Sequence, residues 1–320
     1  MQIRLQKAVS VWIVGVLCLP VGHAFAEGDD NQKETSLKTP TWLIDFSGGI
    51  NAAQAAMINW AAGGENSVAG NAYINFNTVY INGSHKWEAK LNTQYGLTWD
   101  KTNLLNKTVD NLYAATKYGY AIPGDHFYYT ALVEFQTQYD RGYEKIDDRK
   151  KDRNNYISTI MAPGYLNVSA GMEYRLRDLL SVYFSPINCR TTFVLDDSLS
   201  AKGKFGVEKG KHYLFQPGMS LAGALSWTFY KNMTLKTDLT LFTPYDKNFG
   251  NIVVDWNVRL EMAINEYFSA VIGTSLKYDD KVHFTKNGVD VGPKVQFREI
   301  VNIGIGYTFK HETPKAPAAE

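Results

Sequence analysis

The chain has 320 residues, and its 33 Lys and Arg residues nearly balance 32 Asp and Glu residues, leaving a formal net charge of +1. This balance gives no indication of nucleic acid as a partner. The mean hydropathy of -0.27 argues against a bundle of membrane-spanning helices, and after residue 26 no stretch approaches the ~20 consecutive apolar residues that such a helix needs. Aromatic residues make up 13% of the chain, which is typical of proteins whose amphipathic rings line two membrane interfaces.

The N-terminus has the features of a secretory signal peptide. Arg4 and Lys7 are positively charged, residues 8–21 are mostly apolar, and Ala24-Phe25-Ala26 fits the small-residue pattern of a cleavage site. We therefore predict a signal peptide over residues 1–26, export by the Sec route, and cleavage after Ala26.

The two cysteines divide between the predicted signal peptide and the mature chain. Cys18 would suggest a lipoprotein, but the bulky Leu17 stands before it where a small residue is expected. Cleavage leaves Cys189 alone, so no internal disulfide is expected, and we interpret Cys189 as a small buried hydrophobic residue. The polar residues 27–40 predict a disordered lead-in, and residues 310–320 predict a disordered tail.

Between these ends, apolar and polar residues alternate with a period of two, which predicts strands with one apolar face. In the segment 87–100, for example, Trp87, Leu91 and Trp99 share one face, while Glu88 and Lys90 share the other. The segments that we predict as strands are 41–50, 67–81, 87–100, 108–122, 127–140, 166–176, 179–195, 215–229, 233–243, 252–264, 268–278 and 296–309.

The connections between these strands alternate in length. Short turns are predicted at Asn82, Pro123, Arg177, Lys231 and Asn265, and longer loops begin at Asn51, Lys101, Arg141, Asp196, Pro244 and Asp279. Outer-membrane barrels have short periplasmic turns and longer external loops. We therefore predict an all-β fold, a transmembrane antiparallel up-and-down β-barrel of about 12 strands over residues 41–309, with both termini periplasmic. A soluble β-sandwich would need a second sheet to cover each apolar face.

The polar faces of the predicted strands carry charges that would point into the barrel. These lumen-lining candidates are Glu88, Lys90, Glu134, Glu173, Arg175, Lys236, Asp238, Asp255, Arg259, Glu261, Lys277 and Arg298. They could set the selectivity of a polar pore. Alternatively, they could form cross-strand ion pairs that fill the interior and close it. Twelve strands lie between small filled barrels and wide channels, so the strand number does not decide between these interpretations.

A second candidate element is the loop after the first strand. Asn59, Trp60, Gly63, Gly64, Glu65 and Asn66 could form a plug or gate that folds inward, anchored by Trp60. The alternative is an external loop in which the two glycines make a turn. An apolar loop is poorly suited to water, whereas a glycine pair is suited to an external turn. Both interpretations therefore remain open.

The sequence offers little that suggests catalysis, a metal or a cofactor. The histidines are scattered without metal-ligand spacing, and there is no G-x-S-x-G motif. We therefore expect no enzymatic activity, no metal and no cofactor.

Several segments resemble the Bacteroidetes-type outer-membrane barrels of the family called domain of unknown function 3078. These segments are NWAAGGENS at 59–67, KYGY at 117–120, YYTALVEFQTQYDRGY at 128–143, MAPGYLNVSAGMEYR at 161–175, FGVEKG at 205–210 and PKVQF at 293–297. The resemblance extends over most of the chain, from about Trp42 to Phe309. It implies an outer-membrane barrel, and it brings no established activity and no functional residues.

We therefore expect a narrow or gated pore for small polar solutes. The first alternative is a closed binding or structural barrel that acts through its external loops, and a weaker alternative is a lipid-acting enzyme. The expected partners are outer-membrane lipid and the barrel-assembly machinery, which would engage the terminal strand ending at Phe309.

Overall fold

The structure is a computed structural model that describes residues 40–55, 67–100, 105–123, 126–143, 153–246, 249–265, 268–281, 283–286 and 289–305. The predicted signal peptide, nearly all of the lead-in, the candidate plug residues and the predicted tail lie outside the described residues. Among the described residues, no helix is long and apolar enough to cross a membrane.

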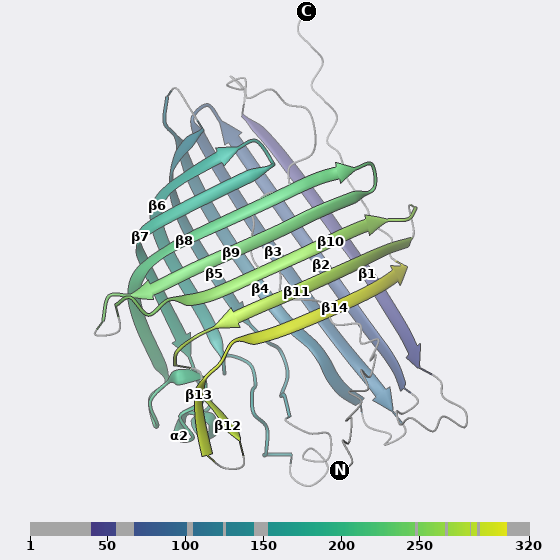
Figure 1. The fold of residues 1–320 in the computed structure, drawn as a ribbon, viewed down its shortest axis with the longest axis vertical. Coiled ribbons are helices and arrows are strands. Elements are labelled where there is room, and N and C mark those ends of the chain that lie inside the picture. Colours follow the sequence, from purple (N-terminus) through teal and green to yellow (C-terminus); the bar gives the residue numbers. More distant parts are fainter. Residues whose placement is uncertain are drawn as a thin grey trace, which may run out of the picture.

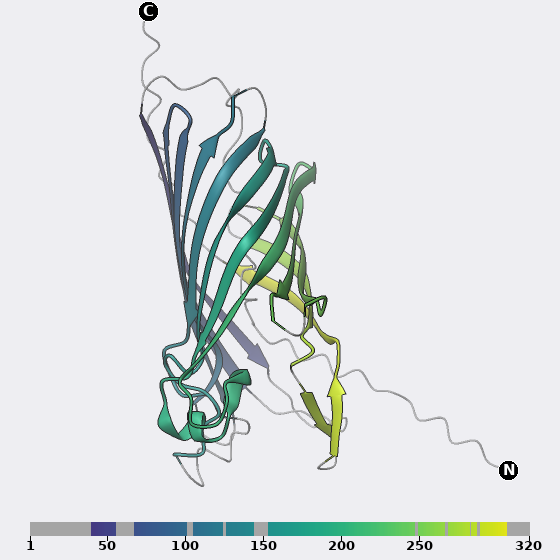
Figure 2. The same cartoon turned by 90° about the vertical axis from the view of Figure 1, so that its left-hand side faces the viewer.

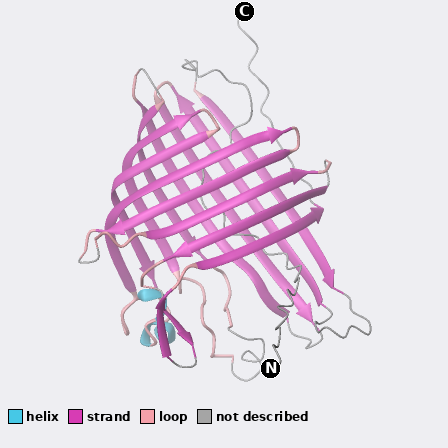
Figure 3. Cartoon of the chain, viewed as in Figure 1, coloured by secondary structure: helices cyan, strands magenta, loops and turns pink. Residues whose placement is uncertain are grey.

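Twelve strands form one antiparallel sheet in which each strand pairs with its neighbours in the order β1-β2-β3-β4-β5-β6-β7-β8-β9-β10-β11-β14 (Figures 1 and 3). The strands are β1 (Thr41–Ala55), β2 (Ser67–Asn82), β3 (His85–Asp100), β4 (Leu105–Ala121), β5 (Phe127–Thr137), β6 (Gly164–Leu176), β7 (Leu180–Phe193), β8 (Tyr213–Tyr230), β9 (Met233–Pro244), β10 (Val253–Ala263), β11 (Phe268–Tyr278) and β14 (Gln296–Ile305). The predicted all-β class and the up-and-down strand order are confirmed.

Three smaller elements lie outside this sheet. A two-stranded hairpin, β12 (His283–Lys286) and β13 (Val289–Pro293), occupies the connection before β14. A short helix α2 (Asp197–Ala201) and the 3-10 turn η1 (Lys204–Gly206) lie between β7 and β8. All three were predicted as plain loop, because runs of three to five residues are too short for a periodic pattern to be recognised.

The first strand is longer than predicted. The sequence analysis ended it at residue 50, whereas β1 continues to Ala55, which pairs with Ser67. The small residues of 51–55 carry no apolar alternation, so this extension rests on backbone pairing with β2 rather than on a side-chain pattern.

The sheet curves so strongly that β8 to β14 lie in front of β1 to β5 in Figure 1, and Figure 2 shows the two layers from the side. Register shifts in the β6–β7 and β7–β8 pairs add bends to the regular right-handed twist. Two glycines allow close backbone approach at these bends. A Cβ atom on Gly171 would collide with the carbonyl of Phe184, and one on Gly218 would collide with the carbonyl of Thr243.

β1 and β14 are the two ends of the strand order. They come near each other, but no backbone ladder joins them within the described residues. The structure therefore gives a curved 12-stranded antiparallel sheet.

Candidate functional site

The two faces of the sheet are the reverse of those of a soluble protein. On β10, Trp256 is 45% exposed on the outer face, while the neighbouring Asn257 is 4% exposed on the inner face. The same contrast separates Val168 from Ser169 on β6 and Leu221 from Ser220 on β8. Buried polar and exposed apolar side chains are the informative exceptions to ordinary burial, so the inner face is where functional groups are to be sought.

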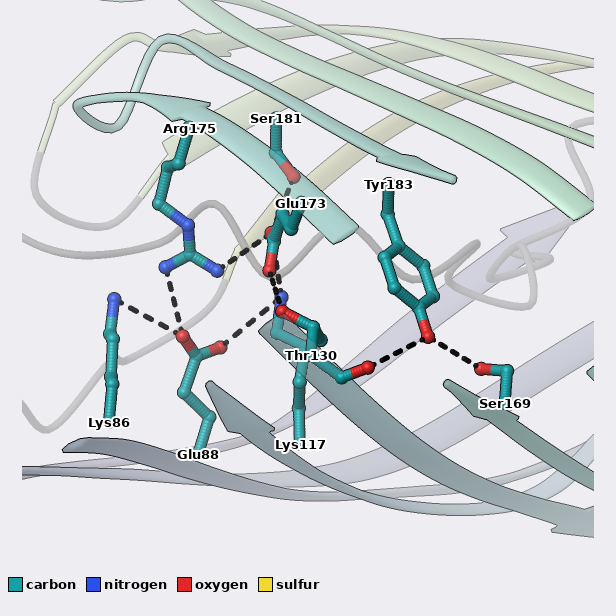
Figure 4. A network of polar contacts seen from close by, with 9 residues as sticks. All are labelled: Lys86, Glu88, Lys117, Thr130, Ser169, Glu173, Arg175, Ser181 and Tyr183. Carbon is teal, nitrogen blue, oxygen red and sulfur yellow. Dashed lines mark hydrogen bonds and ion pairs between the residues drawn. The ribbon is translucent and has the colours of Figure 1, made fainter. Parts of the chain in front are cut away.

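Five charged side chains from β3, β4 and β6 meet on the inner face, and we call them the ion cluster: Lys86, Glu88, Lys117, Glu173 and Arg175 (Figure 4). Arg175 Nη1 lies 2.9 Å from Glu88 Oε1, and Arg175 Nη2 lies 2.9 Å from Glu173 Oε1. Lys117 Nζ lies 3.0 Å from Glu173 Oε1 and 3.8 Å from Glu88 Oε2. Lys86 Nζ lies 3.1 Å from Glu88 Oε1. Each carboxylate therefore faces at least two cations.

Strand register explains part of the ion cluster. Glu88 and Lys117 are directly opposite each other in the β3–β4 pair. Arg175 belongs to β6, three strand steps from β3, which corresponds to roughly 14 Å along a sheet with strands spaced ~4.8 Å apart. Its guanidinium can reach Glu88 because the sheet curves, so that the side chains cross the concave side instead of following the surface. The ion cluster thus ties β3 to β6 across the interior.

Neutral groups complete the hydrogen bonding of Glu173. Ser181 Oγ on β7 donates to Glu173 Oε1 at 2.7 Å, and Thr130 Oγ1 on β5 donates to Glu173 Oε2 at 3.3 Å. Tyr183 continues the network by donating to Ser169 Oγ at 3.1 Å (Figure 4). Buried charges are tolerated when they are paired and hydrogen-bonded in this way.

Little free space remains around the ion cluster. The cavity that its members line together with Gly119 and Tyr128 has a volume of about 10 Å³, which is the room needed by a single water molecule. The Nε atom of Arg175 is buried without a hydrogen-bond partner among the described residues. A cavity of this size has no room for a solute.

A second polar group lies on β9, β10 and β11. Asn257 Nδ2 donates to Asp238 Oδ2 at 2.9 Å and to Asp255 Oδ1 at 3.0 Å, and Lys277 Nζ donates to Asp255 Oδ2 at 2.6 Å. Lys236 and Glu261 form a further cross-strand ion pair at 3.1 Å. Apart from the contact between Asn257 and Asp255 within β10, these are cross-strand pairs of opposite charge or of hydrogen-bonding partners, which stabilise the sheet.

The remaining predicted lumen-lining residues take separate positions. Glu134 Oε1 accepts from Tyr113 at 2.9 Å, and Glu134 Oε2 accepts from Asn167 at 2.8 Å. Lys90 and Arg259 are partly buried. Arg298 is opposite Ser275 in the β11–β14 register. The candidate plug residues Asn59, Trp60, Gly63, Gly64, Glu65 and Asn66 lie outside the described residues.

Several members of the network were missed by the sequence analysis. Lys117 was missed because β4 carries apolar and polar residues on both faces, as the inward Val109 and Tyr113 show. Its position directly opposite Glu88 would have identified it, once the register of the β3–β4 pair was known. Lys86 and Ser181 lie near strand ends, where an alternating pattern is least reliable.

The loops between β5 and β6 and between β7 and β8 fold together into a small unit that we call the loop cap, residues 141–143, 153–163 and 194–212. Its core consists of Tyr156, Ala162, Val194, Leu199 and Val207, with Tyr143, Phe205 and Leu214 packed against it. Figure 2 shows its helical turns at one end of the sheet.

Asp196 joins the two loops of the loop cap. Its side chain caps α2 by accepting from the Leu199 amide, and it accepts from the Tyr156 hydroxyl at 2.7 Å. The hydrogen bond to Asp196 raises the pKa of Tyr156. Burial acts to raise the pKa of Asp196, but the hydrogen bonds from Tyr156 and from the backbone of Leu199 and Ser198 outweigh it and lower that pKa.

The partly buried Cys189 lies on β7 as a free thiol, next to Val168 in the register. Among the described residues, no group of three or more His, Cys, Asp or Glu side chains is arranged to hold a metal ion. The inner-face chemistry that the described residues do offer is ion pairing and hydrogen bonding across strands.

Comparison with known proteins supports part of the sequence interpretation. A model of the family described as protein of unknown function (DUF3078) matches residues 52–143, so the predicted resemblance is confirmed over β2, β3, β4 and β5. No curated protein matches the chain. Among solved structures, the translocator domain of autotransporter NalP from Neisseria meningitidis is similar over 84% of this chain and 88% of that chain, at 9% sequence identity and a TM-score of 0.36.

Proposed function

We propose that the sheet closes through β1 and β14 into an outer-membrane β-barrel whose apolar outer face meets lipid. The reversed faces of the sheet support this proposal. Large side chains such as Trp256, Leu221 and Phe184 are 43–47% exposed, and they continue over neighbouring strands. Soluble monomers rarely expose contiguous apolar patches larger than a few hundred Å². In a barrel, apolar-out and polar-in alternation is the expected pattern.

Aromatic side chains are placed where two membrane interfaces would lie. Near the short turns, the Trp42 ring lies 4.7 Å from Tyr80 and 5.9 Å from Trp87 between ring centroids. At the opposite strand ends, Trp99 and Tyr213 are 50% and 64% exposed. Aromatic girdles at both interfaces are typical of transmembrane barrels. The proposal places the short turns and both termini in the periplasm and the loop cap outside the cell.

Within this barrel, we assign the ion cluster as a gate that holds a narrow lumen shut at the periplasmic end. The single observation that carries this assignment is the direct contact of Arg175 on β6 with Glu88 on β3, across the interior and beside a cavity of only about 10 Å³. The gate opens when these ion pairs separate, and the open state passes small polar solutes. No catalytic step is assigned to any of these side chains.

Planar-bilayer conductance of the refolded mature chain tests the gate. Arg175→Ser removes the longest side chain of the ion cluster and leaves space behind it, so the variant should conduct ions where the wild type is closed for most of the time. Lys231→Ser is the matched control, because Lys231 is an exposed cation in a short turn at the same end. The gate assignment fails if Arg175→Ser is as silent as Lys231→Ser.

The second candidate function is a permanently closed barrel that acts through its external loops. The folded loop cap favours it, since five buried residues hold these loops in one arrangement. Equal silence of the wild type, Arg175→Ser and a variant lacking residues 56–66 would favour this closed barrel. Insertion by the barrel-assembly machinery through the strand ending at Phe309 remains a prediction under both candidates.

A further inference from the structure

The connection between β7 and β8 carries four lysines on one folded turn, Lys202, Lys204, Lys209 and Lys211, which we call the basic loop. All four are exposed, and none has an ion-pair partner among the described residues. The nearby Asp197 lies beside His212 instead, at 3.7 Å. The exposed Glu208 lies on the same turn, so residues 202–211 carry four lysines and one acid, and the basic loop presents a net excess of positive charge.

The basic loop is held in a fixed shape. Gly203, Gly206 and Gly210 have positive φ angles of 66°, 78° and 77°, which glycine adopts readily. Val207 packs into the core of the loop cap, and Ser200 Oγ donates to the Lys211 carbonyl at 2.7 Å. Because the backbone is already ordered, binding an anion would cost little conformational entropy.

An apolar groove lies on the outer face along the same strand. From Lys211, the outer row of β8 passes Tyr213 and Phe215, which are 64% and 54% exposed, and reaches Met219 and Leu221. There, Met219 and Leu221 line a cavity of about 110 Å³ with Phe184, Leu241 and Ile252. An apolar cavity of about 150 Å³ is enough to hold benzene, so this groove has room for a few methylene groups.

The spacing of these features matches an amphiphile. Met219 lies six residues from Tyr213, which is about 20 Å along the strand and about 15 Å in depth for a strand tilted by ~40°. The groove is lined by Leu241 near the end of β9 and by Ile252 just before β10, so it lies toward the loop-cap side of these strands, within reach of an acyl chain of the outer leaflet. The basic loop lies where the headgroup of that molecule would be.

We propose that β8 and the basic loop form a binding site for a phosphate-bearing acylated glycolipid of the outer leaflet. The lysines contact the headgroup phosphates, Tyr213 and Phe215 lie at the sugar and interface level, and one acyl chain occupies the groove. This inference rests on the proposed membrane location and on the assignment of the loop cap to the outer surface.

The test uses the refolded mature chain in phosphatidylcholine nanodiscs, with bound lipid counted by native mass spectrometry. The probes are diphosphorylated lipid A, its dephosphorylated form, phosphatidylglycerol, the deacylated phosphorylated disaccharide and inorganic phosphate. Diphosphorylated lipid A should bind most tightly, and both its dephosphorylated and its deacylated forms should bind roughly tenfold or more weakly.

The variant Lys209→Gln/Lys211→Gln should lose roughly tenfold in affinity for diphosphorylated lipid A. The matched control is Lys231→Gln/Lys294→Gln, which removes two exposed lysines outside the basic loop and should change the affinity less than about twofold. Equal binding by these two variants, or equal binding of phosphatidylglycerol and lipid A, would overturn the site.

Insertion into the lipid bilayer is measured separately, from the circular dichroism of the nanodisc sample. A chain that inserts but shows no lipid preference contradicts this inference alone, and a chain that does not insert contradicts the membrane location and the site together.

Discussion

At the residue scale, Glu173 is the centre of the inner-face network. It faces Lys117 and Arg175 and accepts hydrogen bonds from Ser181 and Thr130, so four residues from four strands converge on one carboxylate. Removing one partner from a buried ion network costs more than the pairing itself contributes, because the remaining charges stay buried without compensation.

Glu173→Gln should therefore destabilise the folded protein by about 3–5 kcal/mol, since Lys117 and Arg175 would then share a single carboxylate. Denaturant-induced unfolding of the refolded protein in lipid measures this loss of free energy. Glu208→Gln, which neutralises an exposed acid in the loop cap, is the control and should stay within about 0.5 kcal/mol of the wild type. Comparable stability of both variants would show that the inner charges are solvated.

Inward-facing charged residues could be selected from the sequence where the alternation was strong, and they were missed where it was weak. Glu88, Glu173 and Arg175 were selected because their strands have one clearly apolar face. Lys117 was not, because its partner Glu88 becomes visible only when the β3–β4 register is known. The contact between Arg175 and Glu88 could not be predicted at all, since it depends on the curvature of four strands together.

At the element scale, β8 shows how glycine permits the sheet to bend. Gly218 lies against the carbonyl of Thr243 and the ring of Phe242, whereas Gly223 on the same strand has open space where a Cβ would be. The first glycine is required by close packing, and the second is not.

Gly218→Ala should accordingly cost about 1–3 kcal/mol of stability through overpacking. Gly223→Ala should be neutral or stabilising by up to about 1 kcal/mol, because alanine is less costly than glycine in a strand. Unfolding midpoints of the two variants in the same lipid give the comparison. A Gly218→Ala protein as stable as Gly223→Ala would mean that β8 and β9 are further apart than described.

The loop cap makes a prediction about pH. The pKa of Asp196 is lowered in the folded state, so the stability that it contributes is present above its unfolded pKa of ~3.9 and is lost as the pH falls through the lower folded value. Cleavage of residues 194–212 by an acid-active protease should accelerate below about pH 4 for this reason.

Asp196→Asn should flatten this pH dependence, because the titrating group that links the loops is gone. Asp197→Asn is the matched control, since the Asp197 side chain is 98% exposed, and it should keep the wild-type profile. An unchanged profile in Asp196→Asn would assign the acid sensitivity to another group.

Most elements could be predicted because each strand of the sheet has its own alternation and its own turn signals. The extension of β1 to Ala55 and the β12–β13 hairpin could not, since neither carries a strong side-chain pattern. The loop cap was missed for a related reason. Its core forms only when two loops that are distant in sequence pack together.

At the scale of the whole molecule, closure of the sheet separates a barrel from an open sheet. β1 pairs with β2 along its full length, which leaves every second backbone amide of β1 facing the seam with β14. An open edge would present these amides as a template for pairing with another chain.

Closure predicts that successive amides of Thr41–Ala55 exchange their hydrogens at similarly slow rates in lipid. Hydrogen exchange resolved by residue provides the measurement, with β3 as the internal standard because both of its edges are paired. Fast exchange at alternate positions of β1, beside uniformly slow exchange in β3, would show that the seam is open.

The most direct test of the whole account is the lipid exposure of adjacent residues, measured by spin-label accessibility to oxygen and to a water-soluble nickel complex in a Cys189→Ser background. Labels at Val168, Leu221 and Trp256 should be accessible to oxygen and shielded from nickel, while labels at Ser169, Ser220 and Asn257 should not show this lipid signature. Nickel accessibility at all three outer positions would mean that water, or another protein, covers the apolar face. That result would contradict the membrane location from which the gate and the glycolipid site both follow.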